Sequence, residues 1–202
     1  MKLLKYVPNI LTSMRLVLTF IYLILLHALN GNNKLYFTAA LIIFILICLT
    51  DFLDGKIARA TKAASPFGAL LDVAADFVYI FSSLIMLSVN NMIPMWFIAL
   101  VLGKFIEFLV TSYFIKKYES KSNSLFIFDY FGRIAAMNFF LIPGISLFVY
   151  ADLDIMYINI LLYITLILVV ISSLVRCANC YKVIKLKRLV YNCDGTTFDK
   201  SL

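Results

Sequence analysis

Residues 155–175 read IMYINILLYITLILVVISSLV and contain no charged side chain. As a helix rising 1.5 Å per residue, this stretch is about 30 Å long, which matches the hydrocarbon core of a bilayer. Further uncharged runs cover 16–33, 35–50, 77–103 and 134–151. Hydrophobic residues make up 63% of the 202-residue chain and charged residues only 14%. In soluble domains about 45–50% of the residues are apolar and about 25% are charged. We therefore expect an integral membrane protein made of helices.

The basic residues predict how these helices are oriented, because Lys and Arg are retained on the cytoplasmic side of membrane spans. They gather mainly at 2–15, 56–62, 116–133 and 176–188. The alternate loops at 30–34, 90–94 and 151–154 contain a single Lys. The pattern predicts an all-α bundle of six transmembrane helices with both termini cytoplasmic, near 8–29, 35–59, 67–89, 92–118, 129–149 and 155–178. We expect residues 1–181 to form this domain and 182–202 a basic and polar cytoplasmic tail.

The net charge of +7 has a simple explanation in this topology. The basic residues flank membrane spans, where they attract the anionic head groups of the bilayer. No separate basic domain is left to hold a nucleic acid strand. The expected setting is a bacterial cytoplasmic membrane, with no nucleic acid partner.

Four carboxylates stand at the expected cytoplasmic ends of the second and third helices: Asp51, Asp54, Asp72 and Asp76. Their spacings of three and four residues place each pair on one helical face. Ionised groups at this depth cost several kcal/mol unless they are compensated. If the two helices are antiparallel neighbours, the pairs converge and favour divalent cations in an all-oxygen site. Alternatively, the Asp residues could be ordinary helix caps that form salt bridges with Lys56 or Arg59. This alternative explains a single Asp better than it explains four.

The residues around these carboxylates complete the pattern D-x2-D-G-x2-A-R, a spacer and G-x3-D-x3-D, from Asp51 to Arg59 and from Gly68 to Asp76. This pattern resembles the signature of the CDP-alcohol phosphotransferases, also called CDP-alcohol phosphatidyltransferases. The opening segment Pro8-Asn9-Ile-Leu-Thr12-Ser-Met-Arg15 resembles the start of phosphatidylglycerophosphate synthases within that family.

The resemblance implies a role for each signature residue. Asp51, Asp54 and Asp72 would ligate two divalent ions, Mg²⁺ or Mn²⁺, while Asp76 would complete the site and act as the catalytic general base. The residues implied to bind the CDP-lipid are Asp51, Asp54, Gly55, Ala58, Arg59, Gly68 and Asp72. Asn9 and Thr12 would lie on the donor side.

The expected function is transfer of a phosphatidyl group from CDP-diacylglycerol to the hydroxyl of a small polar acceptor, with release of CMP. Two metals can neutralise a diphosphate and stabilise an in-line displacement. The resemblance also implies a homodimer. A cation transporter or a non-catalytic membrane assembly protein is the alternative of another class. In a transporter we would expect the carboxylates near mid-membrane, or repeated in a second half of the chain, and the sequence shows neither arrangement. A non-catalytic assembly protein would be expected to have lost at least one Asp of the signature, and all four are present.

The acceptor is less closely specified. Residues 106–114 resemble the Arg-Glu-Phe-x-Val-Thr-Gly-Leu-Arg segment of phosphatidylglycerophosphate synthases, with Ile106 and Phe114 in place of the arginines. The candidate acceptor-binding residues are Arg133, Lys104 and Glu107. The alternative for Arg133 is a positive-inside anchor, and Lys104 and Glu107 are better explained as a pair that neutralises itself within the membrane. Glycerol 3-phosphate is the first acceptor we expect, with inositol phosphate, inositol and serine as alternatives.

Overall fold

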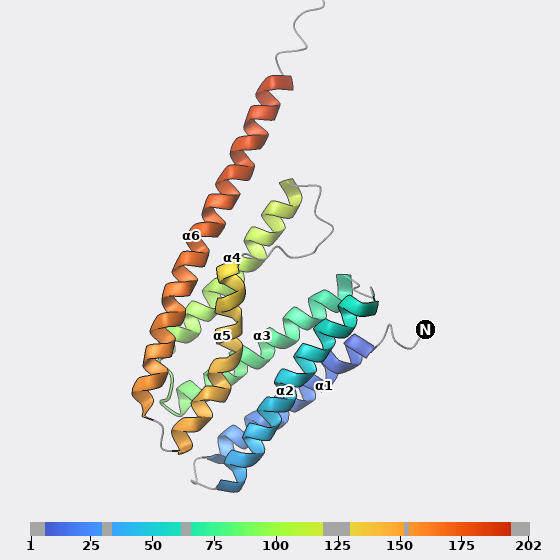
Figure 1. Ribbon diagram of the computed structural model, residues 1–202. Helices are drawn as coiled ribbons and strands as arrows, with labels where there is room; N and C mark the ends of the chain where they lie inside the picture. Colours follow the sequence, from blue (N-terminus) through green and yellow to red (C-terminus); the bar gives the residue numbers. More distant parts are fainter. Residues whose placement is uncertain (1–6, 30–33, 62–65, 119–129, 152–153, 195–202) are drawn as a thin grey trace, which may run out of the picture.

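The computed structural model describes residues 7–29, 34–61, 66–118, 130–151 and 154–194, which contain six long helices (Figure 1). The helices are α1 Val7–Ala28, α2 Lys34–Thr61, α3 Pro66–Val89, α4 Met95–Tyr118, α5 Tyr130–Ser146 and α6 Ile155–Asp194. A 3₁₀ turn, η3 Leu147–Ala151, follows α5 directly. The all-α, six-helix expectation is confirmed, and α6 continues without a break into the segment expected to be a tail.

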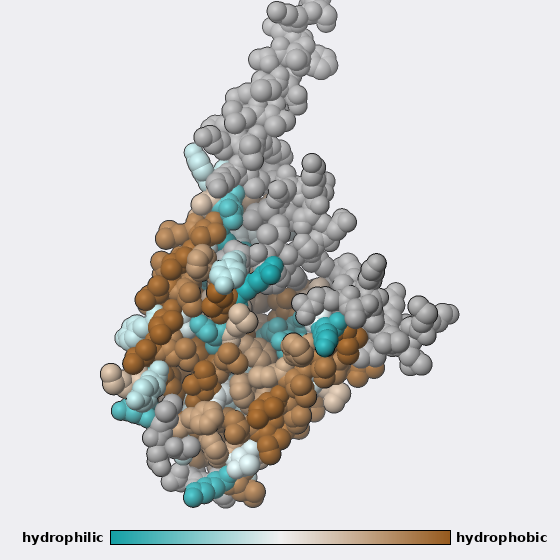
Figure 2. All heavy atoms as spheres, in the orientation of Figure 1, coloured by the Kyte–Doolittle hydropathy of each residue, from teal (hydrophilic) through white to brown (hydrophobic). Residues whose placement is uncertain are grey.

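All six helices are long and apolar enough to cross a membrane. Their outward faces carry large apolar side chains such as Phe20, Val89 and Met95, each more than half exposed in the isolated chain. The space-filling view is accordingly brown over most of its described surface, with teal side chains around a hollow (Figure 2). In water this surface would be unstable, but in a bilayer it meets acyl chains of the same polarity. The chain is therefore a multi-pass integral membrane protein.

The helices alternate in direction and form two groups of three (Figure 1). In the first group, α1 packs against both α2 and α3. In the second group, α6 packs against both α4 and α5. Helix α3 also contacts α4 and α5, so it joins the two groups. Because α2 and α3 pack mainly on α1 rather than on each other, a side chain of α1 can reach both of them.

The C-terminal part of α5 is fixed by buried tyrosines from the other group. Pro143 lies inside α5 and has no N–H to donate, which interrupts the helical hydrogen bonds there. The hydroxyl of fully buried Tyr22 donates to the carbonyl of Pro143 at 2.9 Å, and Tyr79 donates to the carbonyl of Phe140 at 3.4 Å. Next to the proline, Gly144 leaves the space that the ring of Phe44 occupies. These contacts hold α1, α2 and α3 close to α5.

The helix ends at the face opposite the carboxylates are closed by local polar contacts. Asn91 follows α3 with φ 58°, a left-handed conformation that Asn tolerates better than most residues. The N–H of Met92 donates to the carbonyl of Leu87 at 2.9 Å, which caps α3. A carboxylate oxygen of Asp154 accepts the N–H of Met156 at 3.0 Å and caps the start of α6.

Candidate active site

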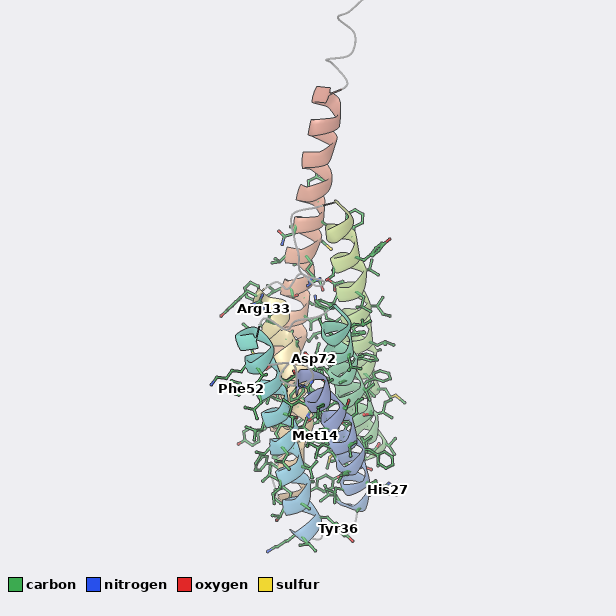
Figure 3. All side chains as sticks on the ribbon, turned by 90° about the vertical axis from the view of Figure 1, so that its right-hand side faces the viewer. Met14, His27, Tyr36, Phe52, Asp72 and Arg133 are labelled. Carbon is green, nitrogen blue, oxygen red and sulfur yellow. The ribbon has the colours of Figure 1, made fainter. Side chains whose placement is uncertain are left out.

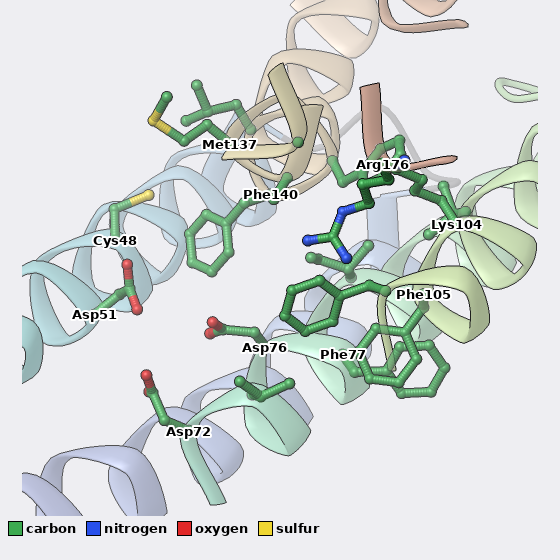
Figure 4. Close-up of a pocket in the computed structure, with 18 residues that line it drawn as sticks. Cys48, Asp51, Asp72, Asp76, Phe77, Lys104, Phe105, Met137, Phe140 and Arg176 are labelled. Atoms are coloured by element: carbon green, nitrogen blue, oxygen red, sulfur yellow. The ribbon is translucent and has the colours of Figure 1, made fainter. Parts of the chain in front are cut away.

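Three carboxylates converge at the end of the first helix group. Asp51 from α2 and Asp72 and Asp76 from α3 each offer an oxygen, and these oxygens lie within 4.8 Å of one another (Figure 4). Their side chains keep 33–42% of their surface accessible. The fourth carboxylate, Asp54, is buried, and its Oδ2 accepts a hydrogen bond from the hydroxyl of Thr12 at 2.8 Å. The structure thus brings both Asp pairs of the signature to one place.

A residue outside the signature lies at the centre of this cluster. Arg15 of α1 is fully buried, and its guanidinium contacts all four carboxylates. Its Nη1 donates to Oδ1 of Asp72 at 2.9 Å and to Oδ1 of Asp76. Its Nη2 lies 2.9 Å from Asp51 and 3.7 Å from Asp54. Carboxylates that lie this close together favour a cation among them. Here α1 supplies that cation from the protein itself, as the guanidinium of Arg15.

A cavity of about 460 Å³ extends from these carboxylates toward the second helix group (Figure 4). Asp51, Asp72 and Asp76 line one side of it, and Lys104 and Arg176 line the other. The wall between them is mostly aromatic and apolar, with Phe77, Phe105, Phe108, Phe139 and Phe140 among its residues. The cavity therefore joins an acidic end and a basic end through an apolar middle.

The two cations at the basic end are held differently. Lys104 Nζ lies 3.2 Å from a carboxylate oxygen of Glu107 and donates to the hydroxyl of Ser173 at 3.1 Å, so α4 already neutralises its charge. Arg176 of α6 donates to the hydroxyl of Thr111, and its Cζ lies 4.9 Å from the centre of the Phe108 ring. Both contacts fix the direction of the Arg176 side chain, which is 4% exposed and faces the cavity.

The other residues expected at the site are placed less centrally. Arg133 is exposed, and the cavity wall includes its neighbour Gly132 but not Arg133 itself. Ile106, at the position of a family arginine, is 51% exposed and is also absent from the wall, as is Phe114. Neither of the two positions that carry arginine in the family segment therefore lines this cavity.

Several site predictions fall on helix ends. Gly55 lies on α2 directly after Asp54, and Gly68 lies on α3 one turn before Asp72. The side chains of Asn9, Ala58 and Arg59 lie outside the described residues. Figure 3 places Asp72 and Arg133 toward one end of the bundle and His27 toward the other, so the single histidine is far from the carboxylates.

The carboxylate cluster fits a hard divalent cation. Its converging ligand atoms are all carboxylate oxygens, the type that Mg²⁺ and Mn²⁺ prefer, and they come from two helices rather than from one flexible loop. Their accessible surface faces the cavity, so a cation and a phosphate could meet there.

Comparison with known proteins supports the same assignment. The family described as CDP-alcohol phosphatidyltransferase matches this chain over residues 5–174. The chain belongs to this family. The match covers α1 to α5 and the first half of α6, and so includes Arg15, the four carboxylates and Lys104. The resemblance read from the signature is confirmed.

Several bacterial proteins are similar to the chain. A protein named cardiolipin synthase (CMP-forming) from Streptomyces coelicolor is 35% identical over 65% of this chain and 60% of its own length. A protein named CDP-diacylglycerol–glycerol-3-phosphate 3-phosphatidyltransferase from Aquifex aeolicus is 34% identical over 55% of this chain and 60% of its own length. A protein of the same name from Wigglesworthia glossinidia brevipalpis is 36% identical over 40% of this chain and 43% of its own length. The chain thus spans about half of the length of these relatives.

Proposed function

We propose that this protein is a membrane-embedded transferase that moves the phosphatidyl group of CDP-diacylglycerol to the hydroxyl of glycerol 3-phosphate and releases CMP. The observation that carries the proposal is the convergence of Asp51, Asp72 and Asp76 on the wall of a cavity within the spans. The names of the Aquifex and Wigglesworthia relatives support the donor and the acceptor.

In this proposal Asp51, Asp54, Asp72 and Asp76 hold two divalent ions, Mg²⁺ or Mn²⁺. When bound, such ions neutralise a diphosphate and stabilise both oxygens of an in-line displacement. Asp76 takes the proton of the acceptor hydroxyl, whose oxygen forms a bond with the lipid-side phosphorus while the bond from that phosphorus to the bridging oxygen breaks. The released oxygen leaves on CMP, so no covalent enzyme intermediate is needed.

Signature residues next to the carboxylates would receive the nucleotide. Gly55, Ala58 and Gly68 are small, which would let a cytidine diphosphate approach the helix backbones, and Arg59 would pair with the diphosphate. Thr12 supports the donor side indirectly, because its hydroxyl orients Asp54.

We place the acceptor phosphate at the basic end of the cavity. Arg176 is the better-supported partner, because its side chain lines the cavity and its direction is fixed by Thr111 and Phe108. Arginine binds phosphate through two parallel N–H bonds. Lys104 contributes less because Glu107 neutralises it, and Arg133 stays a prediction from the sequence.

The resemblance to the cardiolipin synthase (CMP-forming), together with the apolar cavity wall, favours a lipid acceptor as the second candidate. Phosphatidylglycerol offers a glycerol hydroxyl of the same chemistry. For the cell, we propose the cytoplasmic membrane, an active site facing the cytoplasm and a homodimer; the positive-inside pattern supports the first two and the family resemblance supports the third.

The proposal is tested with the purified protein, CDP-diacylglycerol and Mn²⁺ or Mg²⁺. Glycerol 3-phosphate, phosphatidylglycerol, inositol phosphate, inositol and serine are offered in parallel, and CMP release is measured. We expect CMP with glycerol 3-phosphate and none with excess EDTA. Release with another acceptor alone would replace glycerol 3-phosphate, and no release with any acceptor would overturn the proposal.

Matched variants connect this activity to the carboxylates. Asp72→Asn keeps the size of the side chain but removes a metal ligand, and we expect it to abolish CMP release without unfolding the protein. Asp154→Asn makes the same change at the opposite end of the bundle, where Asn also caps a helix. It should retain activity. Activity in Asp72→Asn at saturating metal would count against the site.

A further inference from the structure

Arg15 and the expected metals need the same carboxylate oxygens. We propose that Arg15 is a charge-balancing positioning residue: it holds the carboxylates together before divalent ions bind, competes with the ions, and thereby weakens and tunes metal affinity. This inference rests on the proposed metal-dependent function and goes beyond it, because it concerns a residue outside the signature.

The contacts of Arg15 support competition directly. One guanidinium nitrogen donates to Asp72 and Asp76, and another lies 2.9 Å from Asp51. These are the three residues whose oxygens converge within 4.8 Å as a candidate metal site. Since Arg15 comes from α1, between α2 and α3, it reaches carboxylates of both helices at once. An ion that draws the three oxygens toward itself must loosen these pairs.

A second observation comes from the nitrogen atoms of Arg15 themselves. Its Nε and Nη2 are buried and have no hydrogen-bond partner among the residues that the structure describes, although Nη2 is close to Asp51. These two nitrogens form one edge of the guanidinium, the edge that binds carboxylates or phosphates in pairs. A buried donor without a partner is costly. Arg15 is thus held in this cluster mainly by charge, with hydrogen-bonding capacity left over, and not by an arrangement that satisfies all its donors.

The charges indicate why such a residue is useful. Four carboxylates packed together repel strongly, and Arg15 offsets one of the four negative charges while supplying donors that keep the side chains in place. Without it, divalent ions would meet one more uncompensated negative charge and bind more tightly. A purely structural Arg15 would have the opposite effect, because its loss would disorder the ligands and weaken binding.

The test measures Mn²⁺ binding by the full chain in detergent, without substrate, from the electron paramagnetic resonance signal of free Mn²⁺. We expect Arg15→Met to bind Mn²⁺ about tenfold more tightly than the parent, or tighter still. Arg15→Lys keeps the charge and should stay within about threefold of the parent. Lys56→Met removes a positive charge from an exposed position of α2, and should change the affinity by less than about twofold.

Thermal unfolding provides a second readout. In EDTA the midpoint of Arg15→Met should fall below that of the parent, and saturating Mn²⁺ should raise it by a larger increment than in the parent. If Arg15→Met folds only with metal, its Mn²⁺ release into excess EDTA is measured instead, and release about tenfold slower than from the parent is expected. Equal or weaker Mn²⁺ binding, or equal or faster release, would overturn the inference. A parent chain that binds no Mn²⁺ would instead refute the metal-dependent function.

Discussion

Replacing Arg176 by Met tests where the acceptor phosphate binds. Arg176 is 4% exposed, faces the cavity and is held by Thr111 and Phe108, so it loses little side-chain freedom when it binds an anion. Removing a charge-assisted contact of this kind costs about 1.5–3 kcal/mol, which corresponds to about a ten- to hundredfold lower kcat/KM for glycerol 3-phosphate. Arg176→Lys should recover only part of this, because the planar fork is lost.

The assay follows CMP release against glycerol 3-phosphate concentration at saturating CDP-diacylglycerol, and repeats it with glycerol, which has no phosphate. The loss in Arg176→Met should appear with glycerol 3-phosphate and largely vanish with glycerol, while the KM of the donor stays unchanged. Arg133→Ala is the comparison, and its exposed position predicts less than about a threefold effect. An equal loss with both acceptors would refute a phosphate contact by Arg176, and a larger loss in Arg133→Ala would return the acceptor site to the position predicted from sequence.

Two further predictions concern packing and orientation. A methyl group at Gly144 would overlap the ring of Phe44, so Gly144→Ala should destabilise the protein by about 1–3 kcal/mol in thermal unfolding. At Gly103 an added methyl group meets nothing within 4 Å, so Gly103→Ala should be neutral or stabilise the protein by about 0.5–1 kcal/mol. Equal effects of the two substitutions would show that the ring of Phe44 moves freely. In intact cells, a membrane-impermeant thiol reagent should label Cys introduced at Asn32 and spare Cys at Lys121 in a cysteine-free background, and the reverse pattern would place the carboxylates on the outer face.

The fold and the acidic half of the site could be predicted from the sequence because both depend on local patterns. Uncharged runs of bilayer length mark the helices, and spacings of three and four residues place each Asp pair on one face. The continuation of α6 as one unbroken helix to Asp194 was not predicted, because a charged segment after an apolar run ends a membrane span without ending the helix.

The basic residues of the site could not be assigned in the same way. Arg15 and Arg176 both stand at the ends of apolar runs, where the positive-inside rule already explains an arginine. Their contacts join Arg15 to residues 36–61 positions away and Arg176 to Thr111, and no local spacing encodes such distances. The clue is the absence of charge on this helix face: Leu11 and Thr19 flank Arg15 one turn away, and an arginine among uncharged side chains in a membrane span needs a partner from elsewhere.

Helix α3 carries Asp72 and Asp76 and contacts helices of both groups of the bundle. The acidic end of the cavity is built from helices of the first group, whereas Arg176 belongs to the second. A tilt of one group against the other would therefore change the distance between the acidic and basic ends of the cavity while leaving the spacing of the carboxylates intact.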